Sequence, residues 1–294
     1  MATRQRKSEP AKPAKAAVAA KPAKVAKPPV AKRAPAPVAK RASRPADAGA
    51  RTTLSEAMAA LEAAGSAQTK KTYLRHGAVE PLFGVSFATL KTLHKRIRVD
   101  HDLALALWAT GNFDARNLAV KVVDPARMTP AELDRWARES MVRMCKGYVA
   151  AVACEGPHGL SRADAWLAAP DEPRRTMGWS LVGALAMCDT SVPGAWFDAR
   201  LAEIERGIAA APNAVRYAMN QALLSIGCRD ARLRKAATAA AKRIGPVEVD
   251  HGDTACQTPD AVASIDKAWT HSLSKGFESP AAHERSRESM RLRC

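Results

Sequence analysis

Two neighbouring stretches in the C-terminal half of the chain decide the fold: residues 213–226 read NAVRYAMNQALLSI, and residues 230–243 read DARLRKAATAAAKR. Both repeat apolar residues at intervals of three and four positions, which is the period of one helix face. The apolar positions are Val215, Ala218, Met219, Ala222, Leu223 and Ile226 in the first, and Leu233, Ala236, Ala237, Ala240 and Ile244 in the second. Gly227 and Gly245 stand just past these stripes, where helices commonly end. The pattern predicts a pair of amphipathic helices.

The same helical signals recur upstream of this pair. Thr53 with Glu56, and Thr129 with Glu132, form the capping-box pattern that begins a helix, and a proline follows Thr129 at the first helical position. The further helices expected from apolar periodicity and capping residues span about 86–98, 101–110, 113–123, 140–154, 162–168, 174–188 and 195–208.

Strand signals are nearly absent, since the alternating segment Val247–Asp250 is too short to make a sheet by itself. About ten helices joined by short polar loops predict an all-α protein, which is either a compact bundle or a stack of helix pairs. Pairs that recur about every 35 to 40 residues favour the second architecture, a HEAT-like α-solenoid of stacked antiparallel helix pairs.

Positive charge is concentrated at the N-terminal end. The 294 residues include 46 Lys and Arg against 29 Asp and Glu, a formal charge of +17. Residues 1–51 hold 14 of the basic residues and two acidic ones, so they carry +12 and leave +5 for the other 243 residues. A segment built of Ala, Lys, Pro, Arg and Val is expected to be a disordered arm that binds phosphates without sequence preference. A solubilising tail, a tail for acidic proteins and a transit peptide are the alternatives.

The chain therefore divides into three expected parts: the basic arm at 1–51, the helical domain at 52–246, and a strap with a loosely ordered tail at 247–294. The strap gathers Asp250, His251, Asp253 and Cys256 within seven residues. These side chains either hold a metal ion or make the turn and capping hydrogen bonds of an ordered strap.

Several classes of protein are disfavoured. No apolar run approaches the roughly 18 residues that span a bilayer, and no secretory signal is present, so we expect a cytoplasmic protein without membrane contact. The six cysteines include no C-x-x-C pair, which disfavours a disulfide framework and a zinc finger. The phosphate loops and dinucleotide fingerprints of cofactor enzymes are absent, so no cofactor is expected.

Two features could bind a ligand. Arg174 and Arg175 begin a predicted helix whose dipole opposes their charge, so either the acids Asp171 and Glu172 or a bound phosphate should lie nearby. The second feature is a polar row opposite the apolar stripe of residues 213–226, which is either a solvated face or a ligand-binding surface of the solenoid. The row consists of Asn213, Arg216, Tyr217, Asn220 and Gln221.

From about Tyr73 to Gly245 the sequence resembles the DNA alkylation repair enzymes, HEAT-like solenoids of the AlkD type. The resemblance rests on the order and spacing of four segments, none of which is unique to the family. They are Phe83-Gly-Val-Ser86; His101–Leu107 followed by Asp114-Ala-Arg-Asn-Leu-Ala119; Pro173-Arg-Arg-Thr176; and Ala214–Gly227.

The resemblance implies that a concave helical face holds the DNA backbone. Some family members excise N3- or N7-alkylated purines without flipping the base, using an Asp framed by tryptophans that stabilises the developing positive charge. At the corresponding positions this sequence has Val142 for a tryptophan, Lys146 for the carboxylate, Gln221 for the second tryptophan and Leu224 for an arginine. The phosphate-binding arginine is retained as Arg175.

We therefore expect a monomeric, nucleoid-associated protein that binds double-stranded DNA. The expected DNA contacts are Arg143, Lys146, Arg174, Arg175, Arg216, Asn220 and Gln221.

One alternative is an active alkylpurine-DNA N-glycosylase whose catalytic carboxylate has moved to Glu139, Asp134 or Glu155. Trp136 and Trp179 would then supply the aromatic wall, although helix packing explains both more simply. Another alternative, consistent with the modest charge outside the arm, is a protein-interaction solenoid without a role on DNA.

Overall fold

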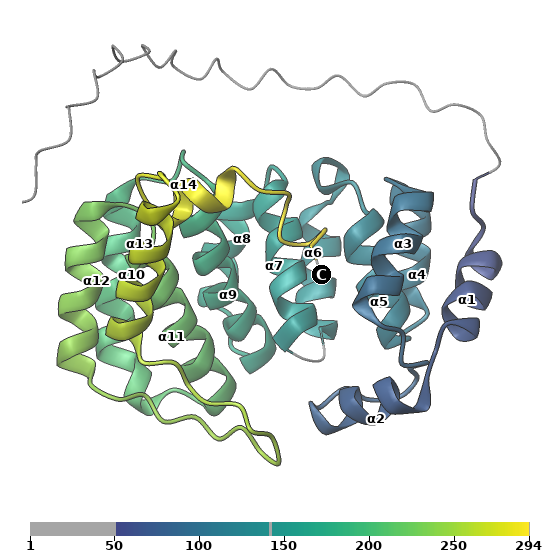
Figure 1. Cartoon of the computed structure of the whole chain (residues 1–294), viewed down its shortest axis with the longest axis horizontal. Helices are drawn as coiled ribbons and strands as arrows, with labels where there is room; N and C mark the ends of the chain where they lie inside the picture. The colour runs from purple at the N-terminus through teal and green to yellow at the C-terminus, as the bar shows by residue number, and fades with distance from the viewer. Residues whose placement is uncertain (1–50, 141–142, 294) are drawn as a thin grey trace, which may run out of the picture. The chain divides into compact units, whose positions relative to one another are not determined.

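The computed structural model describes residues 51–140 and 143–293, with the backbone alone for residues 143–146. Over these residues the chain is helical, and the β-structure is limited to an isolated bridge between Gly65 and Val85 (Figure 1). The α-helices are α1 (Leu54–Ala63), α2 (Ala67–Arg75), α3 (Phe87–Ile97), α4 (His101–Ala109), α5 (Phe113–Val122), α6 (Pro130–Glu139), α7 (Arg143–Glu155), α8 (Gly159–Leu167), α9 (Glu172–Cys188), α10 (Gly194–Gly207), α11 (Asn213–Gly227), α12 (Ala231–Ile244), α13 (Ala261–Ser274) and α14 (Pro280–Arg285). Two short 3₁₀ helices, η1 (Pro125–Arg127) and η2 (Ile208–Ala210), complete the set.

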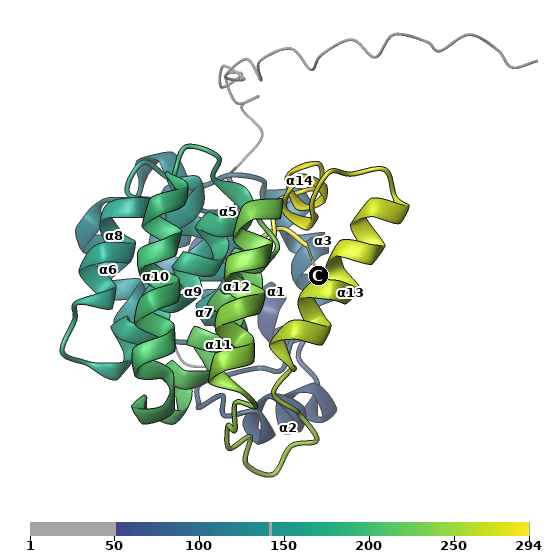
Figure 2. The ribbon, with the colours of Figure 1, turned by 90° about the vertical axis from the view of Figure 1, so that its left-hand side faces the viewer.

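From α4 to α12 the helices form two rows. Consecutive helices pack as the pairs α4–α5, α6–α7, α8–α9 and α10–α11, and α5, α7, α9 and α11 then pack against one another in chain order. We call these four helices the front row, and α4, α6, α8, α10 and α12 the back row. Figure 2 separates α6, α8 and α10 on one side from α13 and α14 on the other. This arrangement confirms the predicted HEAT-like stack of helix pairs.

The capping residues predicted from the sequence begin their helices. The Thr53 and Thr129 hydroxyls accept from the backbone N–H groups of Glu56 and Glu132, and both glutamates bond back to the threonine N–H. The side chains of Ser86, Asp100, Asp171 and Asp230 accept from a backbone N–H in the first turn of α3, α4, α9 and α12, without the reciprocal bond. These bonds satisfy donors that a helix N-terminus leaves without intrahelical partners.

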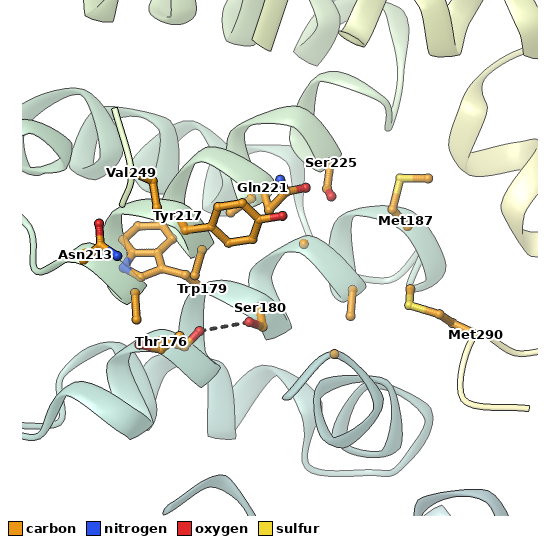
Figure 3. Close-up of a pocket in the computed structure, with 16 residues that line it drawn as sticks. Thr176, Trp179, Ser180, Met187, Asn213, Tyr217, Gln221, Ser225, Val249 and Met290 are labelled. Atoms are coloured by element: carbon orange, nitrogen blue, oxygen red, sulfur yellow. Dashed lines mark hydrogen bonds between the residues drawn. The ribbon is translucent and has the colours of Figure 1, made fainter. Parts of the chain in front are cut away.

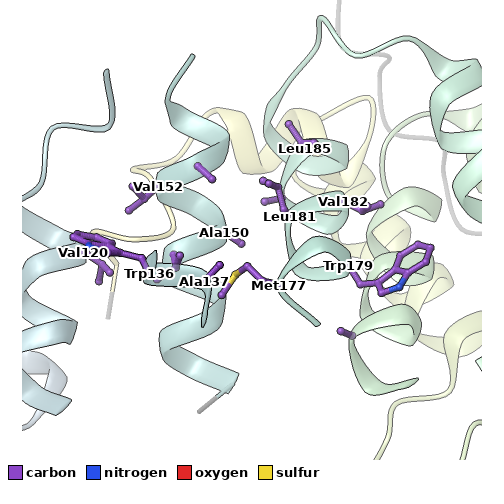
Figure 4. Packing of buried hydrophobic residues seen from close by; sticks show 14 of the residues in the cluster. Val120, Trp136, Ala137, Ala150, Val152, Met177, Trp179, Leu181, Val182 and Leu185 are labelled. Carbon is purple, nitrogen blue, oxygen red and sulfur yellow. The ribbon is translucent and has the colours of Figure 1, made fainter. Parts of the chain in front are cut away.

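Large apolar side chains and small ones alternate in the core. Trp108 of α4 and Trp136 of α6 stack with ring centroids 4.2 Å apart and planes at 8°. Ala137, Ala150 and Met177 meet where α6, α7 and α9 pack together (Figure 4). Burying a large apolar side chain such as Met177 contributes about 1.5 to 3 kcal/mol to the free energy of folding. Trp136 is therefore a core residue of the helix packing, which is the simpler of the two roles that the sequence suggested for it.

A buried carboxylate joins two of the sequence segments that carry the family resemblance. Asp114, which has no exposed surface, accepts from the backbone N–H groups of Phe83 at 2.6 Å, Gly84 at 3.0 Å and Val85 at 2.9 Å. The loop before α3 is thereby tied to the start of α5. The two segments, which are about thirty residues apart in the sequence, are therefore in direct contact in the fold.

The C-terminal segment corrects the expectation of a loosely ordered tail. Residues 261–274 form α13, in which Ile265 and Trp269 are buried and the Trp269 indole donates to the Gly227 carbonyl at 2.8 Å. Gly227 itself is the last residue of α11, so the prediction that it lies beyond the helix is wrong. A Cβ there would stand 2.5 Å from Ile265 Cδ1, so this glycine allows α13 to pack closely.

The expected arm, apart from Arg51, lies outside the described residues. Within the part of the chain that the structure describes, no helix has both the length and the apolar character needed to cross a membrane.

Candidate nucleic-acid interface

A pocket of about 320 Å³ lies between α7, α9 and α11 in the front row (Figure 3). Small residues line much of it: Gly147 of α7, Gly183 and Ala184 of α9, and Ala214, Ala218 and Ala222 of α11. Because these side chains are short, three helices approach closely and still leave a hollow on the surface that they share. We call it the front-row pocket.

Larger side chains close the two ends of this pocket. Trp179 and Tyr217 lie at one end, and Met187 and Met290 lie at the other (Figure 3). Trp179 is 5% exposed, so it serves both the core and the pocket wall. Val249, from the strap that follows α12, also lines the pocket. An aromatic wall beside a small-residue floor suits a flat, apolar group.

The polar groups of the pocket are few and uncharged. The hydroxyls of Thr176 and Ser180 donate to carbonyls of their own helix, at 2.8 and 3.0 Å. Gln221 lines the pocket, and its amide has no hydrogen-bond partner among the described residues. The described lining includes no Asp or Glu. The pocket can therefore hold the edge of a neutral ring but offers no general base.

The two arginines at the start of α9 differ in their partners. Arg174 is held by Asp171, whose Oδ2 lies 2.5 Å from the Arg174 Nε. Burial opposes ionisation of Asp171, but a bond from the Arg174 backbone N–H and this pairing together hold the pKa of Asp171 below its usual value. Arg175 has a buried Nε without a hydrogen-bond partner among the described residues. Asp171 thus pairs with Arg174, and the Arg175 side chain remains available to bind a phosphate.

Two residues of the predicted polar row do not have the surface role expected of them. Asn220 is fully buried, and its amide donates to the Pro259 carbonyl at 3.0 Å. The guanidinium of Arg216 donates to the carbonyls of Ala209, Ala211 and Glu248 at 3.0 to 3.1 Å. Both side chains fasten the segment that follows α12, and these bonds occupy the groups that were expected to contact DNA.

The strap is ordered by hydrogen bonds from its own polar side chains and from Asn213 of α11, in agreement with one of the two interpretations of its sequence. Asn213 bonds to both the N–H and the carbonyl of Asp250, at 2.9 and 2.8 Å. The Asp250 carboxylate accepts from the Gly252 N–H at 2.8 Å, and His251 Nε2 lies 2.9 Å from the Thr258 hydroxyl. These are turn and capping bonds.

The side chains of Arg143 and Lys146 lie outside the described residues, as does Val142. The backbone places Arg143 and Lys146 in the first turn of α7, and the same helix contributes Gly147 to the pocket. Their contact with DNA remains a prediction.

The three candidates for a displaced catalytic carboxylate are all engaged elsewhere. Glu139 accepts from the Trp108 indole at 2.6 Å and pairs with Arg116 at 3.2 Å. Asp134 accepts from the Trp166 indole at 2.6 Å and pairs with Arg162 at 3.0 Å. Glu155 pairs with Arg291 at 2.7 Å. Each carboxylate links neighbouring elements of the fold, and none lines the front-row pocket.

Sequence reasoning singled out Gln221 and Arg175 but missed the front-row pocket, which Gln221 lines. One signal was available, because Ala214, Ala218 and Ala222 recur at intervals of four and predict a small-residue face on one helix. No sequence pattern shows that this face meets Gly183 of another helix and Gly147 of a third.

Comparison with known proteins agrees with this architecture. Residues 57–262 match the sequence profile of the family described as DNA alkylation repair enzyme. A solved structure from a family of proteins related to the HEAT-like repeat DNA glycosylases, with affinity for branched DNA structures, superimposes with a TM-score of 0.68 at 31% identity. That match covers 76% of this chain and 94% of the other.

Two uncharacterised proteins, one from Listeria monocytogenes and one from Listeria innocua, are each 27% identical over 215 residues. In both cases the match covers 71% of this chain and 93% of the relative. The family profile spans well over half of the sequence, and the solved relative shares both its fold and nearly a third of its aligned residues. This chain belongs to the DNA alkylation repair enzyme family.

Proposed function

We propose that this protein binds DNA across its front row of helices, holding backbone phosphates through Arg175 and, on the neighbouring helix, Lys146 and Arg143. It acts as a binding protein and does not excise bases. The relative with affinity for branched DNA structures supports the same class of ligand here. Phosphate contacts of this kind position a protein on DNA without reading its sequence.

Arg175 carries this proposal. A buried guanidinium N–H without an acceptor costs free energy, and the dipole of α9 adds an unfavourable interaction with the positive charge. A phosphate oxygen beside Arg175 would relieve both terms at once, because it accepts a hydrogen bond and carries the opposite charge.

The absence of a carboxylate from the described pocket lining argues against excision. Glycosylase chemistry of the family type needs a negative charge beside the sugar, where positive charge develops. The nearest candidates in sequence, Glu139, Asp134 and Glu155, are bound to indoles, arginines or both. A lysine at position 146 would repel the forming cation.

The substitution Arg175→Ala tests the phosphate contact, with Arg206→Ala as its matched control. Arg206 is an exposed arginine of α10 in the back row, so its removal changes the net charge equally. We expect Arg175→Ala to weaken duplex binding and to lower the slope of log affinity against log salt by about one, as the loss of one phosphate contact should. Fluorescence anisotropy at several salt concentrations measures both. Equal losses in the two variants would show that only net charge matters.

Excision is tested separately, by incubating the protein with duplex that contains 7-methylguanine and assaying abasic sites. We expect none above the protein-free control. Release that a single Asp or Glu substitution abolishes would establish the enzyme instead.

A further inference from the structure

The front-row pocket is not explained by backbone binding. A surface that holds phosphates needs cations, but the described lining of this pocket is uncharged and mostly apolar. Its volume of about 320 Å³ is at the small end of the range for ligand sites, which fits one compact ring system. The size and the uncharged lining of the pocket therefore suit a ligand group that is flat, neutral and no larger than a few fused rings.

A nucleobase has these properties. Base faces stack on aromatic side chains such as Trp and Tyr, while base edges exchange hydrogen bonds with side-chain amides. The half-buried Tyr217 provides most of the aromatic surface at one end, since Trp179 is almost completely buried, and the Gln221 amide presents a donor and an acceptor to a ring edge. Gly183 helps to keep the floor flat, since even a Cβ there would approach the Ser225 hydroxyl to 3.2 Å.

The proposed phosphate site and one wall of the pocket lie on the same turn of α9. Thr176 lines the pocket and directly follows Arg175 on α9, so one nucleotide could place its phosphate on the arginine and its base between α9 and α11. A base held there has left the stack of the duplex. Unstacking a paired base costs a few kcal/mol, and the cost is least for a base that is already unpaired.

We propose that the front-row pocket binds one unstacked nucleobase, so that the protein prefers DNA with unpaired nucleotides, such as those at branches and bulges. This inference rests on the proposed function, because the pocket can act only on DNA that the front row already holds. It differs from excision without base flipping, since here the base itself enters the protein.

Three DNA probes test the proposal: a fully paired duplex, the same duplex with one unpaired adenosine, and the same duplex with an abasic residue at the bulge. The abasic probe bends and exposes its backbone as the bulged probe does, but it has no base to offer. We expect the full-length protein to bind the adenosine bulge about fivefold or more tightly than the abasic bulge, the lower end of what stacking one base on an aromatic side chain contributes.

Two substitutions localise the effect. Ala214→Leu fills the pocket from the first turn of α11, and Gln221→Leu removes the edge hydrogen bonds at little change in size. Ala214→Leu should abolish the preference for the base and leave duplex affinity within about twofold, whereas Gln221→Leu should weaken the preference, because stacking on the aromatic side chains remains. Ala199→Leu, at an exposed position of α10 in the back row, is the matched control and should change neither. Circular dichroism melting confirms that each variant is folded.

The outcomes separate this inference from the proposed function. If wild-type protein binds no DNA, both are overturned. If it binds all three probes with equal affinity, the pocket assignment is overturned while DNA binding stands. Equal weakening of all three probes by Ala214→Leu would also overturn it, because the pocket would then contribute to backbone binding. The wild-type comparison needs no variant and decides the question even if a substitution prevents folding.

Discussion

Single residues that look alike in the sequence take different roles in the structure. Arg174, Arg175 and Arg216 were all candidates for phosphate contacts, yet Arg174 is held by a neighbouring aspartate and Arg216 by three carbonyls. The Nε of Arg175 and that of Arg216 are both buried without a partner among the described residues, but only Arg216 has its terminal guanidinium nitrogens bound to carbonyls. A cation is available to DNA only where the fold has not already supplied its acceptor.

Asp114 gives the first prediction at this scale. Asp114→Ala leaves three backbone N–H groups without their acceptor, and at least two of the bonds are buried. We expect a loss of about 3 kcal/mol in the free energy of unfolding, because hydrogen bonds to charged groups contribute about 1.5 to 3 kcal/mol each and are only partly replaced by water. Urea unfolding measures it. Asp114→Asn keeps one acceptor oxygen and should lose less; an equal loss would contradict this account.

The cysteines give a prediction that depends on pH. The Cys154 thiol donates a hydrogen bond to Cys188, which lowers the pKa of the exposed Cys188, while burial raises the pKa of Cys228 to about 11. Since the thiolate is the reactive form, a lower pKa gives more of it at a given pH. We expect iodoacetamide at pH 8 to label Cys188 well before Cys228, as followed by peptide mass spectrometry. Cys154→Ala removes the donor and should slow labelling of Cys188.

Among the elements, those with clear apolar stripes or caps were predictable, and the exceptions are instructive. α2 was missed because its sequence is polar and Tyr73 is its one buried residue. α13 was missed although its buried residues Ala261, Ile265 and Trp269 recur every four positions after the capping Asp260. The sequence of α2 lacks a periodic apolar signal. The sequence of α13 has one, from which the helix could have been predicted.

The last residues of the described chain act as a structural element in their own right. Arg291, 6% exposed, pairs with Glu155 of α7 and donates to the carbonyls of Val120 and Lys121 near the end of α5. Lys121, which is fully buried, donates in turn to the carbonyls of Arg291 and Arg293. The tail therefore ties α5 to α7.

We expect Arg291→Ala to lower the free energy of unfolding by about 2 to 4 kcal/mol, because it leaves a partly buried carboxylate and two helix carbonyls without their donor. Thermal and urea unfolding measure the loss. The control is Arg287→Ala, whose side chain is 52% exposed and should change stability by less than about 0.5 kcal/mol. A small effect of Arg291→Ala would mean that the tail only rests on the helices.

At the scale of the whole molecule, most of the excess charge lies outside the described residues. Residues 1–51 carry +12 of the total of +17. Deleting residues 1–50 should therefore lower DNA affinity and flatten its salt dependence substantially, because fewer counterions are released on binding. Anisotropy titrations of full-length and shortened protein at several salt concentrations measure the change, with the circular dichroism spectrum as the folding control. An unchanged slope would show that the arm does not contact DNA.

The sequence by itself determined the all-α class, most helix boundaries, the position of the positive charge and the retention of Arg175. These follow from interactions within a few residues, such as the capping bond of Thr129 or the apolar stripe of α11, so local sequence contains the information. Tertiary structure alone decided which polar groups remain free and where the pocket lies. Arg216 finds its acceptor Glu248 more than thirty residues away, and Gly147, Gly183 and Ala218 meet from three separate helices. Partners so distant in the chain are chosen by packing, which no local pattern records.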